Sequence, residues 1–564
     1  MNANSIIFII SLFFVFLSIS NSFAKGKYHN KCGFNLSLDP NSIDELQRTL
    51  KLDQDRIPKV GQKQFVSNNN LFKIHYDTTG YNAPDLTDLD NNGTPDYIDS
   101  VAYYCEYAYN VQVNEIGYKS PIPDGGNRGS DHYDIYIWDL GNSDNPDTPQ
   151  GEDYDQGGLY GLTLWNDKDA ISFTPFQRTY SFMVLDNNYS PFDSVRLKNS
   201  NERYPAYKTN GIEALKITIS HEFQHAIQCI YGISVPAPMT IMEMCGVAME
   251  FRLFPESTDY LQYITKIFSN LSAYPFGVEN KYTGYGFSIF AKYIMQNYGD
   301  GILKNMWELV GNNIELYRAL DSSFTLNKLS FKNEWATFTK WAYFTGSRAI
   351  EGEYFSDAKK LPEIKFDRNL VYSKPSISSF RGTRPLEIGA LRFQIKGTDH
   401  NSDDTLDILY SNNDAKSASQ QIEIYRNYNY YLTEYNDNTY IPLKLINMFY
   451  KNLSDTNYII SQIIQRPGNI TTNIDYAYPN PYNPNSNNMI YFPAPTNSKV
   501  YENATLVIFN TEMLPIISKK DKLSLNETKR VFSYENLDLQ NGVYIYSVAT
   551  SANYTIGKFT IVRK

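Results

Sequence analysis

The chain is poor in the residues that bind transition metals through nitrogen or sulfur. Its 564 residues include only six histidines and four cysteines. Two of the histidines, His221 and His225, nevertheless lie four positions apart in the sequence HEFQH. With histidine this rare, we do not expect that spacing by chance, and it is the first indication of a metal site.

Basic runs and long apolar runs are also missing. The formal net charge is −10 and no run of Lys and Arg occurs, which argues against a nucleic-acid partner. Beyond residue 24, no segment approaches the roughly 18 apolar residues that a membrane-spanning helix needs. We therefore expect no transmembrane span in the mature chain.

Residues 1–24 have the features of a secretory signal peptide. Ile6–Ser20 is an apolar run of 15 residues, which is short for a spanning helix and typical of a signal-peptide core. Small residues at Ser22 and Ala24 predict cleavage before Lys25. Because the first five residues contain no Lys or Arg, an uncleaved membrane anchor is the alternative.

The four cysteines allow more than one chemistry. Export permits disulfides, and Cys32, Cys105, Cys229 and Cys245 allow three pairings. A Cys229–Cys245 bridge would join the histidine-bearing segment to a later one rich in glutamate. Buried cysteines without disulfides are the alternative.

The hydrophobic patterns divide the rest of the chain into four parts. Residues 25–70 are polar and irregular and resemble a leader or propeptide. Residues 71–350 combine strand-like runs with mainly helical sequence after Ile212. Residues 351–474 and 475–564 contain short strands between turn residues, which is typical of β-sandwiches. The expected fold class is multidomain α+β.

Within residues 71–350, individual elements can be predicted. Alternating apolar residues predict strands over LFKIHYDTT, YDIYIWDL and YSFMVLD. Val101–Gly117 has the pattern of an amphipathic helix. Further along, LEIGALRFQIKG, DTLDILYSN and QQIEIYRN are expected to be strands of the next part.

The sequence HEFQH can hold a catalytic zinc ion. On a helix, His221 and His225 face the same side and can bind one metal. Glu222 lies beside them and is placed to accept a proton from a zinc-bound water. The flanking residues are largely apolar, which predicts a buried helix beneath a cleft. A core helix with two structurally satisfied histidines is the alternative.

Catalytic zinc usually has three protein ligands, so a third is needed. The metzincin pattern requires a histidine six residues after His225, where this chain has Tyr231, and that class is excluded. The segment IMEMCGVAMEF instead supplies Glu243 and Glu250. We predict Glu243 as the third ligand and Glu250 as a carboxylate that orients a histidine, with the reverse assignment left open.

Carbonyl hydrolysis also needs a group that stabilises the developing oxyanion. The only histidine after His225 is His400, in the β-rich part of the chain, so we look to a tyrosine. In KYTGYGFSIFAKYI we choose Tyr285 over Tyr282. A purely structural tyrosine is the alternative, because the chain contains 47 tyrosines.

HEFQH followed by a helix-borne Glu243 resembles the gluzincin metallopeptidases. Over roughly residues 71–350 the chain is similar to secreted bacterial metalloproteases known as MXAN-type, through FKIHYDTTG, NGTPDYIDSV, HEFQHAIQ, MEMCGVAME, YGFSIFAKYI and WAYFTGSR. The aromatic residue usual before the ligand glutamate is absent, and Cys245-Gly246 stands where Ala and Thr are common. The resemblance implies a zincin-like fold with zinc as cofactor, and leaves the substrate unspecified.

A second possible metal-binding motif precedes the mainly helical sequence that begins after Ile212. Oxygen-bearing side chains occupy positions 1, 3, 5, 9 and 12 of a loop with Gly93 at position 6, namely Asp88, Asp90, Asn92, Asp96 and Asp99. This is EF-hand spacing with Asp in place of the last Glu, and it resembles dockerin and thrombospondin calcium repeats. Hard oxygen ligands favour Ca²⁺ over zinc. An Asx-rich turn before a helix is the alternative.

Residues 476–564 resemble the type IX secretion C-terminal sorting domain of Bacteroidetes-like bacteria. The similarity lies in YPNPYNP, IYFPAP, ATLVIFN, NGVYIYSV and the terminal GKFTIVRK. It implies export through the periplasm and outer membrane, with the type IX secretion machinery as a partner. An ordinary terminal immunoglobulin-like module is the alternative.

These features together predict a secreted or cell-surface zinc endopeptidase that acts on protein or peptide substrates, with Glu222 as general base. A surface-displayed adhesion protein with a catalytically inactive peptidase-like domain is the alternative from another class. An aminopeptidase is a third option, but no segment of the GxMEN type is present to bind a substrate amino terminus.

Overall fold

The computed structural model describes Cys32 and most of residues 61–563. The gaps within that span are 123–125, 127–129, 143, 145–157, 173–175, 177, 198, 234–237, 281, 373–376, 380–383, 396–404, 420–427, 433–445, 451–458, 467–475, 496–497, 500, 527–528 and 552. The predicted signal peptide, residues 25–31 and 33–60 of the 25–70 segment, and the strand expected over QQIEIYRN fall outside the described residues. The described part is a mixed α+β protein, which confirms the fold class at that level.

The first sheet contains the strands that the alternating patterns predicted. Its order is β1-β2-β3-β5-β4, in which β2, β3 and β5 are parallel while β1 and β4 are antiparallel to their neighbours. The bounds are Lys63–Val66 (β1), Phe72–Tyr76 (β2), Tyr133–Trp138 (β3), Gly161–Ser172 (β4) and Arg178–Asp186 (β5). A small hairpin of Ser194–Arg196 (β6) and Arg203–Pro205 (β7) follows.

The two faces of this sheet bury different sets of side chains, because successive residues of a strand point to opposite faces. Ile135 and Met183 belong to the main core, which includes helices α3 and α4. Tyr136 and Phe182, one position along, pack in a separate small cluster on the other face. The sheet therefore has one face that is fixed against the helices that bear the candidate site.

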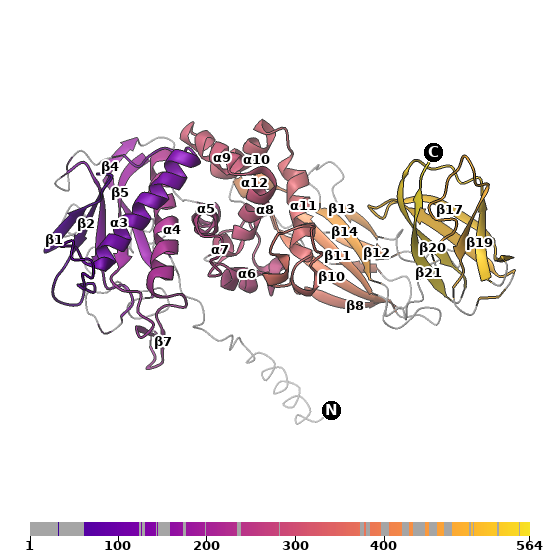
Figure 1. Cartoon of the computed structure of the whole chain (residues 1–564), viewed down its shortest axis with the longest axis horizontal. Helices are drawn as coiled ribbons and strands as arrows, with labels where there is room; N and C mark the ends of the chain where they lie inside the picture. Colours follow the sequence, from indigo (N-terminus) through magenta and orange to yellow (C-terminus); the bar gives the residue numbers. More distant parts are fainter. Residues whose placement is uncertain are drawn as a thin grey trace, which may run out of the picture.

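Two helices cover that face (Figure 1). α3 was expected to begin at Val101 but begins five residues earlier, at Asp96. It runs to Tyr109, and the chain then continues as a π-helix to Glu115. α4 spans Gly211–Tyr231 and carries HEFQH. Their shared core includes Val101 of α3 and Phe223 of α4.

The stretch after Ile212 is mainly helical, as predicted. After α4 come α5 (Met239–Leu253), α6 (Leu261–Phe268), α7 (Thr283–Gly286), α8 (Ser288–Tyr298), α9 (Gly301–Gly311), α10 (Leu316–Leu326) and α11 (Phe331–Tyr343). Short 3₁₀ turns lie at Leu271–Ala273, Gly346–Arg348 and Ala358–Lys360. Trp335 of α11, in contact with Phe276 and Phe290, anchors an aromatic cluster at the centre of these helices.

The main core continues past residue 350 without a break. Ile388 and Leu409, from the strands that follow, belong to the same core as the helices. The strands are Arg368–Tyr372 (β8), Ile377–Ser379 (β9), Ile388–Ile395 (β10), Thr405–Asn412 (β11), Tyr428–Leu432 (β12), Ile446–Tyr450 (β13) and Ile459–Arg466 (β14), with a short helix α12 at Ala415–Ser419. They form two sheets, β14-β11-β10-β8 and β13-β12-β9.

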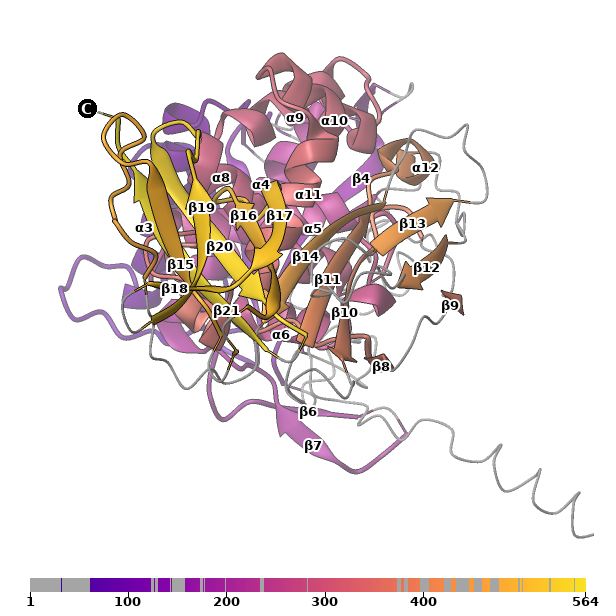
Figure 2. The same cartoon turned by 90° about the vertical axis from the view of Figure 1, so that its right-hand side faces the viewer.

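The C-terminal part has its own core. Its strands are Met489–Pro493 (β15), Asn503–Phe509 (β16), Pro515–Lys522 (β17), Ser524–Asn526 (β18), Lys529–Glu535 (β19), Gly542–Ala549 (β20) and Tyr554–Ile561 (β21). They form the sheets β15-β19-β18 and β17-β16-β20-β21, seen at the front of Figure 2. Phe492 of one sheet contacts Tyr546 and Phe559 of the other, so the two sheets enclose one hydrophobic core.

Within the described residues, no helix has both the length and the apolar character that crossing a bilayer requires.

Candidate metal centre

The packing of helix α4 on the sheet fixes the rotation of the helix about its own axis. Phe223 packs edge-on against Phe72 of β2, with 5.9 Å between the ring centroids. Since each residue turns a helix by about 100°, His221 lies about 200° around the helix from Phe223. The contact with the sheet therefore directs His221 and His225 away from it, towards α5.

Helix α5 approaches this side of α4 unusually closely. Gly246 makes the approach feasible, because a Cβ at that position would lie 2.7 Å from Cε1 of His221. Where the short helix α7 meets α5, a Cβ at Gly284 would lie 2.6 Å from Cβ of Glu243. The two glycines thus let α5 pack closely against both His221 and α7. Of the pair Cys245-Gly246, the glycine has this steric role.

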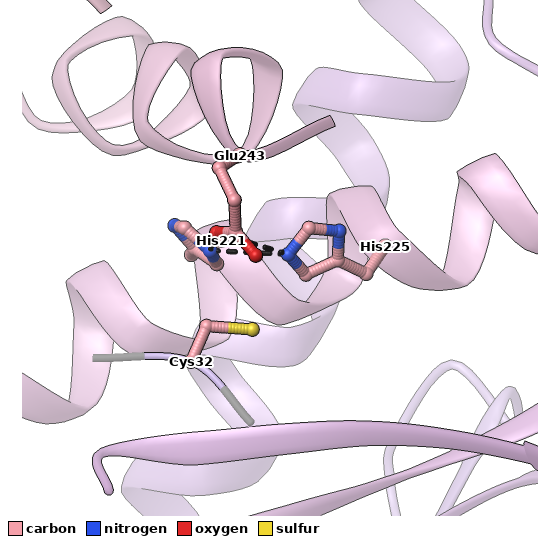
Figure 3. Close-up of side chains that lie close together, drawn as sticks. All are labelled: Cys32, His221, His225 and Glu243. Atoms are coloured by element: carbon pink, nitrogen blue, oxygen red, sulfur yellow. Dashed lines mark hydrogen bonds and ion pairs between the residues drawn. The ribbon is translucent and has the colours of Figure 1, made fainter. Parts of the chain in front are cut away.

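The close approach brings three metal-binding atoms together (Figure 3). Nε2 of His221 lies 3.1 Å from Nε2 of His225 and 3.1 Å from Oε2 of Glu243. Nε2 of His225 lies 3.7 Å from the same Oε2. A tetrahedral zinc with ligands about 2.0–2.1 Å away requires ligand atoms about 3.3 Å apart. The three observed separations bracket that value, so the donor set fits zinc.

The other ring nitrogen of each histidine is held by an acceptor. Nδ1 of His221 lies 2.8 Å from Oε1 of Glu250. Nδ1 of His225 lies 2.8 Å from Oε1 of Gln228, whose amide nitrogen donates to the main-chain oxygen of Met242. These contacts favour the proton on Nδ1 and leave the Nε2 lone pairs for a metal. Glu250 therefore lies behind His221, while Glu243 faces both Nε2 atoms.

The histidines and glutamates of this cluster are buried, and their charges shift one another's pKa. Burial by itself disfavours the imidazolium form of His221, but the contacts with Glu243 and Glu250 outweigh it and raise its pKa above the ordinary value. For Glu243, burial acts to raise the pKa, and the neighbouring His225 and His221 hold it below the ordinary value. Without metal, His221 is therefore in the imidazolium form at neutral pH, with a proton on Nε2 as well as on Nδ1. A metal must displace the proton on Nε2, so its affinity falls as the pH falls.

Glu222 lies on the β4 side of the two histidines. Its carboxylate Oε2 and its main-chain oxygen are each 2.8 Å from the hydroxyl oxygen of Thr163 on β4. Because Glu222 is 1% exposed, this hydroxyl is an important polar partner for the carboxylate. Thr163 fixes the orientation of Glu222, a role that no pattern in the sequence predicts.

The predicted tyrosine Tyr285 lies at the centre, and Tyr282 does not. The ring of Tyr285 is nearly parallel to that of His221, with centroids 6.0 Å apart, and it also stacks on Tyr263. Burial raises the pKa of Tyr285 well above its ordinary value, and the charges of Glu243 and Cys32 add to this. Tyr282, half-buried, lies beneath the ammonium group of Lys266 instead.

A fourth ligand group, Cys32, was not expected at this site. One ligand atom each of Cys32, His221, His225 and Glu243 lies within 4.8 Å of the others. The four cysteines of the chain all lie in the described part, are buried and form no disulfide. The Cys229–Cys245 bridge is therefore absent. No spacing rule links Cys32 to residues almost two hundred positions away, so only the tertiary structure reveals its place.

The loop before α3 gathers its acidic side chains. One ligand atom each of Asp88, Asp90 and Asp96 lies within 4.8 Å of the others. The amide of Asn92 reaches Asp90 and also Asp99, at 3.1 and 2.9 Å. Gly93 takes a positive φ of 90° and donates its N–H to Asp88. The loop thus has the turn of an EF-hand-like site, stabilised by its own hydrogen bonds.

Compared with known proteins, the chain matches no protein-family model, no curated protein and no solved structure.

The ligand assignment predicts different effects for the two glutamates. Glu243→Ala removes a ligand atom of the triangle and should weaken zinc binding by more than roughly 100-fold. Glu250→Ala removes the partner of His221 Nδ1 but keeps all three ligand atoms, and should weaken zinc binding by roughly 10- to 100-fold. Metal analysis and competition with a chromophoric chelator measure both. Equal stoichiometric binding by the Glu243→Ala protein would assign the third ligand elsewhere.

The close packing of α5 on α4 predicts an effect of a single methyl group. Gly246→Ala should push the His221 ring from its position and lower zinc affinity, with the fold retained. Gly301→Ala is the matched control, since a Cβ there meets no atom within 4 Å. Zinc affinity is measured by competition titration and folding by circular dichroism. If both variants bind zinc like the parent protein, the proposed steric role of Gly246 is wrong.

Proposed function

We propose that the protein is a secreted zinc endopeptidase whose catalytic unit is zincin-like. The observation that supports this most strongly is the triangle of His221, His225 and Glu243 next to the buried carboxylate of Glu222. In this proposal the first three residues hold the zinc. When bound, zinc polarises the scissile carbonyl and lowers the pKa of water towards neutrality.

The chain's own groups would carry the proton transfers. Glu222, oriented by the hydroxyl of Thr163, would accept the proton of the attacking water and then donate it to the leaving amine. Glu250 and Gln228 would keep the two imidazoles in the tautomer that leaves Nε2 unprotonated. The geometry supports these roles because each of the three side chains contacts the group on which its role depends.

Tyr285 would stabilise the developing oxyanion. Its raised pKa keeps the hydroxyl protonated at neutral pH, and a protonated hydroxyl can donate a hydrogen bond to a negatively charged oxygen. Its position on the ring of His221 supports this assignment over Tyr282. A Tyr285→Phe substitution removes the donor while leaving the stacked ring.

The edge of the sheet suggests how a peptide would bind. Among the described strands, β4 is the last of the first sheet and pairs on one side only with β5. An extended peptide can add to such an edge through main-chain hydrogen bonds. Since Thr163 of β4 contacts Glu222, a peptide on this edge would pass beside the proposed general base. Peptide or protein chains are therefore the proposed substrates.

The C-terminal part supports the proposed route of export. Its two sheets share one core that is separate from the main core, as expected for an independent β-sandwich. We propose that it is a sorting domain for type IX secretion, and that residues 351–474 form a β-sandwich attached to the catalytic unit.

The catalytic proposal predicts the outcome of one conservative substitution. Glu222→Gln should retain stoichiometric zinc, because Glu222 is outside the ligand triangle, and should lose hydrolysis of a quenched-fluorescence peptide library by at least about a hundredfold. Zinc content is measured in the same preparations by elemental analysis. Hydrolysis by this variant at the parental rate would exclude Glu222 as the base. The comparison is made on proteins that carry Cys32→Ser, because the Cys32 thiol lies in the same ligand cluster.

The loop of Asp88–Asp99 is proposed to bind Ca²⁺ and to rigidify the start of α3. Calcium at a hundred times its dissociation constant should stabilise the fold by about 2.7 kcal/mol. Asp88→Asn with Asp90→Asn should remove this increment, while Asp131→Asn, an exposed aspartate outside the loop, should keep it. Thermal unfolding with and without Ca²⁺ measures the difference. An increment of equal size in the double variant would place the calcium elsewhere.

A further inference from the structure

The thiol of Cys32 lies close enough to the three other ligand atoms to be a fourth ligand of the metal. Figure 3 shows Glu243 and Cys32 on opposite sides of the two imidazoles, and all four ligand groups lie within 4.8 Å. Three protein ligands leave one position of a tetrahedral zinc for water. A cysteine thiolate is a preferred zinc ligand and can take that position.

The main chain of Cys32 is fixed at the same place. Cys32 forms a parallel β-bridge with Gly161, the first residue of β4. A Cβ at Gly161 would lie 2.6 Å from Cγ2 of Thr218 and 3.0 Å from Cγ of Glu222, so this strand is pressed onto α4. The backbone of Cys32 thus occupies the edge of β4 beside the proposed general base. A peptide substrate would need the same edge.

With Cys32 in place, the centre is closed to solvent. Cys32 and Glu222 are each 1% exposed, Glu243 is 5% exposed and both histidines are fully buried. A working hydrolase must admit both a peptide carbonyl and a water molecule to this point. The four ligand groups are therefore enough for a metal site. Their burial leaves no access for a peptide substrate.

We propose that Cys32 is an inhibitory ligand that keeps the peptidase latent, an inference that rests on the proposed function. Its thiolate fills the position that water requires, and its backbone covers the start of the substrate-binding edge. Loss of Cys32 leaves His221, His225 and Glu243 as ligands with one open position. The exchange replaces sulfur by water at the metal, and the released thiolate takes a proton from solvent; no oxidation occurs.

The sequence between Cys32 and β1 contains basic residues at which cleavage would release Cys32 from the site. Cys32 precedes β1, which begins at Lys63, and the connecting residues include Arg48, Lys51, Arg56 and Lys59. Cleavage at one of these basic residues would separate Cys32 from the catalytic unit without breaking any of its described strands or helices. Activation by a trypsin-like peptidase is the corresponding expectation.

The test compares the full exported chain with its Cys32→Ser variant, each prepared with zinc. Cys105→Ser is the matched control, because Cys105 is equally buried but lies outside the metal cluster. X-ray absorption at the zinc edge should show a sulfur neighbour at about 2.3 Å in the parent and in Cys105→Ser, and only nitrogen and oxygen at about 2.0–2.1 Å in Cys32→Ser. Hydrolysis of quenched peptides should rise by roughly tenfold or more in Cys32→Ser alone, since water gains the open position.

Each outcome separates the inference from the function on which it rests. Zinc without a sulfur neighbour in a parent that hydrolyses the peptides, or hydrolysis by the parent at the same measurable rate as by Cys32→Ser, would overturn the inhibitory role and leave the peptidase proposal standing. A sulfur neighbour in the parent with an inert, zinc-loaded Cys32→Ser would make Cys32 a structural ligand and favour the adhesion alternative. Loss of the gained activity in the Cys32→Ser, Glu222→Gln double variant, with zinc retained, would confirm both proposals.

Discussion

The approach of α5 to α4 is the constraint on which the rest of the site depends. The two helices come so close that the ring of His221 lies where a side chain at Gly246 would be. This places Glu243 against both Nε2 atoms and Glu250 behind His221. A wider separation would take the carboxylates of Glu243 and Glu250 away from the imidazoles, and a buried charge that loses its partner costs several kcal/mol.

The same packing explains why one buried cluster can serve a metal. Each histidine is held at Nδ1 by an acceptor, so its Nε2 lone pair points towards the shared centre. Without metal, a proton on His221 partly balances the carboxylates. Zinc can replace that proton with little movement of the side chains, because the three ligand atoms are already near tetrahedral spacing. The scaffold is thus preorganised for the metal and needs no folding around it.

Cys32 adds a second use of the same centre. The residues that would make an open catalytic site also make a closed one once a thiolate joins them. A parallel bridge to β4 fixes the cysteine through its backbone, so metal ligation and blockage of the sheet edge are coupled. In the proposed mechanism, latency depends on the number of protein ligands at the metal and ends when the connection to Cys32 is lost.

The sequence by itself determined the local features: the strand β3 from its alternation, the helix α4 from its apolar spacing, and the pairing of His221 with His225 from the helical repeat. These depend on neighbours within a few residues. Only the tertiary structure decided which glutamate faces the Nε2 atoms and that Thr163 orients Glu222. It alone brought Cys32 to the metal centre, because that contact is set by the packing of β4 and α5 on α4, and packing between distant segments leaves no periodic trace in the sequence.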